Sequence, residues 1–218
     1  MRSIASGSRV RHELTITRSR FITTLAHTPT ESAARALIAQ VRAEFPDARH
    51  HCTAFVIKPD GLNEIGHSSD DGEPSGTAGM PMLEVLRREN MVNVTAVVTR
   101  YFGGVLLGAG GLVRAYSTSV SEALARAQRV TLAERDVWEF TIDHALSGRV
   151  DAQLRSREIP VLNIDYSDRV CIRCAPPPDH AQWLTDALAQ WSAGTAIPTV
   201  VGRTVCEFAE RESSPLDK

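Results

Sequence analysis

The glycine-rich stretch between Arg100 and Arg114 holds the residue types and spacing best suited to chemistry. Its glycines occupy five of nine successive positions, namely Gly103, Gly104, Gly108, Gly110 and Gly111. The preceding residues, 94–98, form a short β-rich apolar run, and helical periodicity begins at Leu112. In such a loop the backbone N–H groups can point at an anion, and the end of the following helix adds partial positive charge. The pattern predicts a strand, an anion-binding loop and a helix.

The side chains that flank this loop extend the same interpretation. Arg100 and Arg114 bracket the glycines and could bind phosphate, while Tyr101 and Phe102 offer flat faces on which a base could stack. The alternative is a tight connection whose glycines only let the strand and the helix pack closely. The spacing matches neither the dinucleotide-binding fingerprint nor a P-loop. This chain has no acidic residue at the distance that the fingerprint requires, and it lacks the Gly-Lys-Ser/Thr of a P-loop.

A second candidate is the acidic cluster formed by Asp70, Asp71 and Glu73. These carboxylates could hold Mg²⁺ or position a catalytic base. Alternatively they cap the helix predicted over residues 77–90 and orient the arginines of the glycine loop. The structural interpretation is favoured because adjacent carboxylates often serve as helix caps.

Basic side chains on the first predicted strands form a third candidate. Arg18 and Arg20 are two residues apart and would share one strand face, as would Arg9 and Arg11 upstream. Such a row could follow a phosphate backbone, or it could be a solvated edge that discourages pairing between sheets. The sequence leaves these two alternatives open.

Histidine and cysteine residues give weaker signals. His51 lies between His50 and Cys52, but strand alternation sends it to the opposite face, so three metal ligands would need help from elsewhere. Cys171 and Cys174 form a C-x-x-C within an alternating strand, which also separates their side chains. We expect no metal and no cofactor.

Length and composition limit the class of protein. The 218 residues can form two domains, and 43% hydrophobic with 23% charged residues exclude disordered and fibrous classes. The 24 basic and 26 acidic side chains do not indicate nucleic-acid binding by charge alone. Without an apolar run long enough for a membrane span or a signal peptide, we expect a cytoplasmic protein with no membrane association.

The predicted N-terminal domain covers residues 1–134 and is of mixed α+β type. Its first elements are two short strands that turn near residues 18–20, followed by a helix capped by Thr30 and ended by Pro46. A strand at 52–56 is expected to pair with residues 62–65, and the segment that begins at His67 reads as turn-forming up to the helix at 77–90.

The predicted C-terminal domain covers residues 135–211, with a flexible tail at 212–218. Its pattern is strand, helix, strand, strand, helix, strand over residues 137–142, 147–157, 161–166, 170–174, 179–191 and 199–208. This βαββαβ order predicts a ferredoxin-like fold.

With these segments laid out, the chain resembles the YigZ/IMPACT family over nearly its whole length. The motifs that carry the resemblance are long: Arg18-Ser19-Arg20-Phe21, the DARHHC segment at 47–52, DDGEPSGTAG at 70–79, VTRYFGG at 98–104 and GAGGLVRAYS at 108–117. Two positions depart from many relatives, His51 in place of asparagine and Leu106 in place of lysine, and the second removes one anion contact from the loop.

The resemblance implies an N-terminal domain with the fold of the second domain of a small-subunit ribosomal protein, and a C-terminal domain similar to a late domain of elongation factor G. Eukaryotic members of the family regulate translation by competing for the activator of a starvation-responsive kinase. We therefore expect a non-enzymatic regulator that binds RNA, the ribosome or a ribosome-associated factor. A Mg-dependent hydrolase or phosphoryl-transfer enzyme and a pure protein-interaction module remain alternatives.

Overall fold

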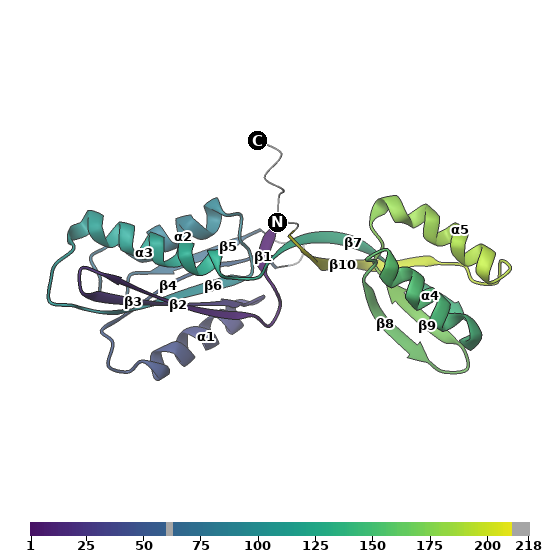
Figure 1. Cartoon of the computed structure of the whole chain (residues 1–218), viewed down its shortest axis with the longest axis horizontal. Coiled ribbons are helices and arrows are strands. Elements are labelled where there is room, and N and C mark those ends of the chain that lie inside the picture. The colour runs from purple at the N-terminus through teal and green to yellow at the C-terminus, as the bar shows by residue number, and fades with distance from the viewer. Residues whose placement is uncertain (60–62, 211–218) are drawn as a thin grey trace. The chain divides into compact units, whose positions relative to one another are not determined.

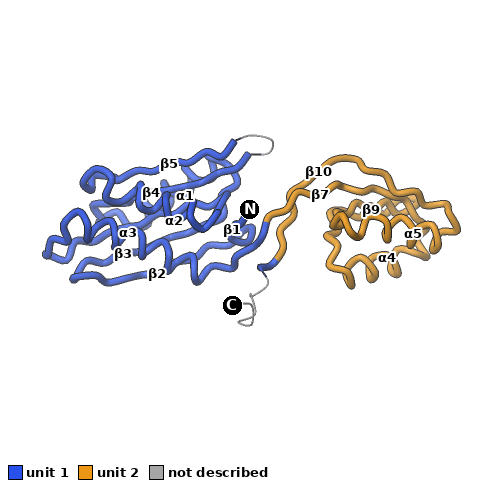
Figure 2. Tube along the Cα trace, turned by 90° about the horizontal axis from the view of Figure 1, so that it is seen from above, with its two compact units in different colours: residues 1–131, 209–218 blue, residues 132–208 orange. Residues whose placement is uncertain are grey.

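The computed structural model describes residues 1–59 and 63–210 and is a mixed α+β protein (Figure 1). The chain divides into two compact units, residues 1–131 with the segment from Ala209 onward, and Leu132–Phe208 (Figure 2). The predicted tail at 212–218 lies outside the described residues. Each unit is described separately below.

The first unit contains a five-stranded antiparallel sheet with strand order β2-β3-β6-β4-β5. Helix α1 lies on one face and helices α2 and α3 lie on the other (Figure 1). Because both faces are covered, the central strands β3, β4 and β6 are buried along almost their whole length, so successive residues are buried and not only alternate ones. The elements are β2 (Arg9–Ile16), β3 (Ser19–His27), α1 (Glu31–Glu44), β4 (His50–Ile57), β5 (Ile65–Ser69), α2 (Gly79–Arg88), β6 (Val94–Tyr101) and α3 (Gly108–Ala125).

Helix α1 begins and ends where the sequence predicts. The Thr30 side chain accepts a hydrogen bond from the Ala33 N–H at 3.1 Å, which satisfies one of the free donors at the helix start. The helix ends at Glu44, and Phe45 leaves the helical conformation directly before Pro46. The predicted cap and stop are therefore confirmed.

One strand in this unit lies later than predicted, and one was not predicted. The predicted hairpin of β4 is confirmed, but its partner β5 begins at Ile65, where the predicted segment 62–65 ends, and runs to Ser69. His67, which was predicted to lie in a turn-forming segment, belongs to this strand and stacks on Phe55 with ring centroids 5.0 Å apart. The residues around His67 are polar, as in a loop, because β5 is an exposed edge strand that buries few side chains. Position 62 of the predicted partner lies outside the described residues. The sequence also gave no sign of β1 (Arg2–Ile4), whose pattern is too short to read.

The second unit confirms the βαββαβ prediction. Its elements are β7 (Arg129–Ile142), α4 (His144–Ser156), β8 (Val161–Tyr166), β9 (Val170–Cys174), the short 3₁₀ helix η1 (Pro178–His180), α5 (Ala181–Trp191) and β10 (Thr199–Ala209). The sheet order is β8-β9-β7 with β10 paired to β7, which is the ferredoxin-like arrangement. Strand β7 starts eight residues before the predicted Val137, so it also supplies Arg129–Thr131, which pair with β1 in the first unit.

A single apolar cluster holds the second unit together. Leu154 from α4 and Leu184 from α5 are fully buried against Phe140 and Ile172 of the sheet. Cys174 belongs to this core whereas Cys171 is only half-buried, and all four cysteines of the chain are free thiols. Within the described part of the chain, no helix is both long and apolar enough to cross a membrane.

Replacement of Leu154 by Ala is expected to destabilise the second unit by about 2–5 kcal/mol, because it removes buried methyl groups and leaves a cavity. Urea unfolding followed by tryptophan fluorescence measures this directly, since Trp138, Trp183 and Trp191 all lie in this unit. The control is Leu162→Ala, at a side chain 44% exposed, which should change the free energy of unfolding by less than about 1 kcal/mol. Equal effects of the two changes would contradict the core assignment.

Candidate functional site

One end of the first unit's sheet brings most of the predicted site residues together. Strand register places Arg100 of β6 opposite His50 at the start of β4, and Tyr101 opposite Arg20 at the start of β3. The β2–β3 turn, the start of β4 and the β6–α3 connection therefore share this end, as Figure 1 also shows.

The β6–α3 connection is shorter than the sequence predicts. Helix α3 begins at Gly108 and not at Leu112, so Gly110 and Gly111 lie in its first turn. Helical periodicity missed this turn because it carries no apolar stripe. Leu107 occupies the N-cap position and has no side-chain acceptor, and residues 108–111 contain no carboxylate. The first N–H groups of α3 therefore lack a side-chain cap, and the helix end carries partial positive charge.

Gly103 is required by a close backbone approach. A Cβ atom at this position would lie 2.1 Å from the carbonyl group of Arg18, which no side chain could tolerate. The Gly103 N–H donates to the Ser19 hydroxyl at 3.2 Å and ties the connection to the β2–β3 turn. Arg18 has a φ of 67°, in the left-handed region, so the turn that carries it is tight.

A buried ion pair joins this end of the sheet to the loop between β5 and α2. Arg100 Nη1 lies 2.7 Å from Glu73 Oε1, and the two side chains are only 7% and 3% exposed. The Tyr116 hydroxyl of α3 donates to the same oxygen at 2.7 Å. The Arg100 guanidinium also lies over the Phe21 and Phe102 rings, 5.4 and 5.7 Å from their centroids. Arg100 is thus turned into the protein and not toward solvent.

The other two carboxylates of the loop are also occupied by donors of the chain itself. Asp70 accepts the N–H groups of Gly76, Ala78 and Gly79 at 2.8 to 3.0 Å and so caps the start of α2. Burial alone would raise the pKa of Asp70, but these three hydrogen bonds lower it overall.

Asp71 binds the Arg42 guanidinium and accepts the His51 N–H at 2.6 Å. Burial opposes ionisation here too, and these two donors lower the pKa of Asp71 overall. The sequence predicted that the acidic cluster would orient Arg100 and Arg114. The structure brings only Glu73 to Arg100, and it pairs Asp71 with an arginine of α1 that sequence reasoning had not considered.

His51 and Cys52 lie inside the sheet. His51 is 5% exposed and its Nδ1 lies 3.1 Å from the Thr99 hydroxyl; burial, followed by the positive charge of Arg42, lowers its pKa. The Cys52 thiol donates to the Asp70 carbonyl at 3.0 Å, and burial raises its pKa to about 12. Among the described residues, no group of three or more His, Cys, Asp or Glu side chains is arranged to hold a metal ion.

The predicted basic residues divide into paired and unpaired groups. Arg9 and Arg11 bind Glu44, and Arg20 binds Glu13 at 2.8 Å while lying over the Tyr101 ring. Within the described part of the chain, no ion-pair partner lies within 4.0 Å of the exposed Arg18, Arg49 and Arg114. Sequence reasoning missed Arg49, although its position directly before the buried strand β4 could have indicated it.

Exposed apolar side chains occupy the same connection. Leu106 is 86% exposed and Phe102 is 49% exposed, and Val105 between them is also exposed. These exposed apolar side chains, called here the apolar tip, are a candidate contact surface for another molecule.

Fold and site together define a class of two-domain α+β proteins, in which a five-stranded domain with a glycine-rich β6–α3 connection precedes a ferredoxin-like domain. Residues 17–124 match the Impact N-terminal domain, and residues 140–195 match a domain of unknown function, DUF1949. The chain belongs to the IMPACT family.

Individual relatives cover most of the chain. It is 45% identical over 184 residues to the IMPACT family member YigZ of Escherichia coli, which covers 83% of this chain and 88% of that protein. It is 43% identical over 160 residues to YvyE of Bacillus subtilis, covering 73% and 72%. A crystal structure of a hypothetical protein is similar with a TM-score of 0.59 and 39% identity, over 92% of this chain and 97% of that one.

Replacement of Glu73 by Gln is expected to lower the free energy of unfolding of the first unit by about 3–5 kcal/mol, because it leaves the buried Arg100 charge without its partner. Tyr116→Phe removes one hydrogen bond to that carboxylate and should cost about 1.5–3 kcal/mol. The control Glu64→Gln breaks an exposed pair with Arg87 and should cost less than about 1 kcal/mol. Hydrogen exchange at β6 amides reports on this unit; a Glu73→Gln effect no larger than the control's would disprove the assignment.

Acidification is expected to destabilise the first unit partly through His51. Its folded-state pKa lies below the ordinary value of 6.5, so between these two values the unfolded chain binds more protons. The free energy of unfolding therefore falls as the pH decreases below about 6.5, by at most about 1.4 kcal/mol per pH unit. Unfolding measured from pH 7 to pH 5 should show a weaker decline in His51→Asn; the same decline in both proteins would rule out His51 as a source.

Proposed function

We propose that this protein is a non-enzymatic, translation-associated regulator that binds ribosomal RNA phosphates through one end of its first unit. This binding surface, called here the Gly/Arg surface, consists of Arg18, Arg49, Phe102, Arg114 and the N-terminus of α3. Membership of the chain in the IMPACT family supports a role in translation, because resemblance to this family implies a translation regulator. The observation that carries this proposal is that three exposed arginines without ion-pair partners among the described residues lie on α3 or on segments next to the strand ends at this end of the sheet, where α3 begins without a side-chain cap.

Each part of the Gly/Arg surface has a chemical role in this proposal. The N–H groups at the start of α3 and the guanidinium groups of Arg18, Arg49 and Arg114 bind phosphate oxygens, which are the main source of affinity for RNA. Phe102, half exposed, offers its free face to an unstacked base. Arg100 acts as a positioning residue, because its buried guanidinium supports the Phe102 ring from below.

The enzymatic alternative has less support. A Mg²⁺-dependent reaction would need carboxylates free to coordinate the ion, whereas Asp70, Asp71 and Glu73 each accept hydrogen bonds from the chain. Replacing these donors by a metal ion would uncap α2 and break the buried ion pair of Arg100.

A protein-interaction role has one specific observation in its favour, the apolar tip at Val105 and Leu106. Side chains of this kind bury well in a hydrophobic groove of a partner protein, but they contribute little to phosphate binding. A protein partner would therefore depend on Leu106, whereas RNA would depend on the arginines.

The double replacement Arg18→Gln and Arg114→Gln is expected to weaken binding to ribosomal subunits and to single-stranded RNA by about tenfold or more, because two phosphate contacts are lost. The slope of log K against log salt concentration should fall by about 1.4 for single-stranded RNA. The matched control is Arg88→Gln, an exposed arginine in the last turn of α2, which should leave affinity and slope unchanged. Filter binding or fluorescence anisotropy across a salt series gives both quantities.

Two results would refute this proposal in different ways. Unchanged RNA affinity in the double variant would remove the Gly/Arg surface as an RNA site. Loss of ribosome binding in Leu106→Ser, with no change in salt dependence, would instead identify the partner as a protein.

A further inference from the structure

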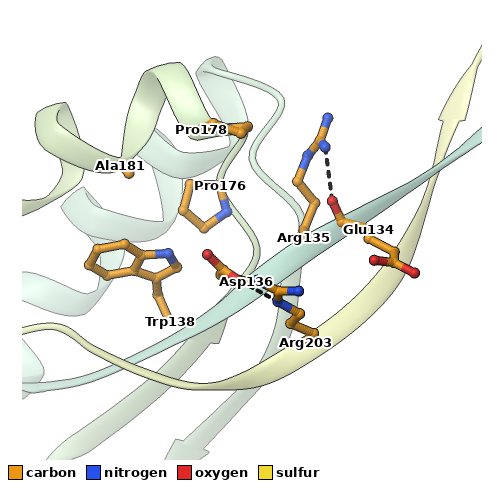
Figure 3. Close-up of a pocket in the computed structure, with 8 residues that line it drawn as sticks. All are labelled: Glu134, Arg135, Asp136, Trp138, Pro176, Pro178, Ala181 and Arg203. Carbon is orange, nitrogen blue, oxygen red and sulfur yellow. Dashed lines mark hydrogen bonds and ion pairs between the residues drawn. The ribbon is translucent and has the colours of Figure 1, made fainter. Parts of the chain in front are cut away.

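The second unit contains a pocket of about 390 Å³. It lies between strands β7 and β10 and the start of α5 (Figure 3). Its volume falls within the range of about 300–1,000 Å³ typical of small-molecule sites, and it is much larger than one water molecule needs. All the residues that line it belong to this unit, so it is independent of the Gly/Arg surface.

One wall of the pocket is apolar and rigid. Trp138 of β7 is half-buried and packs against the core of the unit, so its ring is fixed in place. Pro176, Pro178 and Ala181 face it across the pocket (Figure 3). Because the prolines have a fixed φ and an apolar ring, this wall exists before a ligand arrives.

The rim of the pocket carries charges of both signs. Asp136 and Arg203 form an ion pair at 3.0 Å, in which both side chains remain largely exposed. Arg203 uses its Nε for this pair, so its terminal nitrogens remain available to an acceptor. The carboxylate of Glu134 lies on the same rim (Figure 3).

Arg135 contributes an unused donor. Its Nη1 donates to the Glu134 carbonyl oxygen at 3.0 Å, and its guanidinium lies over the Phe208 ring with 5.2 Å to the centroid. Its Nε is buried, and within the described residues it has no hydrogen-bond partner. A buried N–H group without an acceptor is unfavourable, so a ligand acceptor that reaches this N–H group would satisfy it.

We propose that this pocket binds a free α-amino acid with an apolar side chain. The α-carboxylate accepts hydrogen bonds from Arg135 and Arg203, and the α-ammonium group lies beside Asp136 and Glu134. An α-amino acid carries these opposite charges on adjacent groups, which matches the close spacing of Asp136 and Arg203. The apolar side chain packs on Trp138 and the prolines, which disfavours polar amino acids. The pocket would then be the binding site of a small-molecule effector.

The test is a titration of the full chain with L-leucine and L-phenylalanine, followed by calorimetry and by the NMR signals of the tryptophan indole N–H groups. We expect saturable binding and a shift of one indole signal, which is identified as that of Trp138 by its absence in Trp138→Phe. Arg203→Gln should weaken binding by about tenfold or more, because it removes a charged donor to the carboxylate.

The control variant is Arg155→Gln, since Arg155 has a similarly exposed side chain, 69% against 76%, and forms a comparable ion pair with Asp151 on α4. It should bind the amino acids as the unchanged protein does. The control ligand is N-acetyl-phenylalanine amide, which keeps the ring but has neither charge, and it should not bind.

Three outcomes would overturn the proposal. They are the absence of saturable binding of either amino acid, equal binding of the amide, and equal weakening by Arg203→Gln and Arg155→Gln. Equal binding of the amide would show that the pocket recognises a peptide segment or an apolar group alone. None of these results bears on RNA binding by the first unit.

Discussion

The structure of the candidate site depends on one interaction, the buried ion pair between Arg100 and Glu73. Neither charge could remain in the protein interior alone, since an unpaired buried ion is strongly destabilising. Each therefore fixes the position of the other, and the Tyr116 hydroxyl joins helix α3 to the pair. In this way the end of β6, the loop between β5 and α2, and helix α3 are joined at one carboxylate, that of Glu73. The ion pair and the Phe21 ring, which contacts both Tyr116 and Arg100, hold these segments together.

This constraint separates two kinds of arginine that look alike in the sequence. Arg100 is buried in its ion pair with Glu73 and lies against the Phe102 ring, whereas Arg18 and Arg114 remain exposed. Gly103 makes the separation possible, because only glycine allows the β6–α3 connection to lie against the backbone of Arg18. An uncapped helix start and a set of unpaired guanidinium groups are thereby presented together. That combination is the basis of the phosphate-binding proposal, which the overall charge of the chain would not have suggested.

Both units consist of helices packed on an antiparallel sheet, but their candidate sites lie in different places on that architecture. In the first, helices cover both faces of the sheet, and the polar side chains of the candidate site lie at one end of the strands. In the second, the helices and the sheet share one apolar core, and a pocket with mixed charges lies beside the rigid Trp138 and proline wall. Because the residues of each site come from one unit alone, a variant in one site provides a control for the other.

The sequence by itself determined the α+β class, the ferredoxin-like order of the second unit and the boundaries of α1, because periodicity, caps and proline act locally. It also identified the glycine loop and the acidic loop as one region of interest. It missed β1 and misplaced β5, whose short or exposed segments carry no periodic signal. Only the tertiary structure decided which carboxylate meets which arginine, because those partners are 27 or more residues apart and the choice depends on strand register. For the same reason, only the fold could show that Arg100 is buried, that Arg49 belongs to the exposed surface, and that Trp138 lines a pocket.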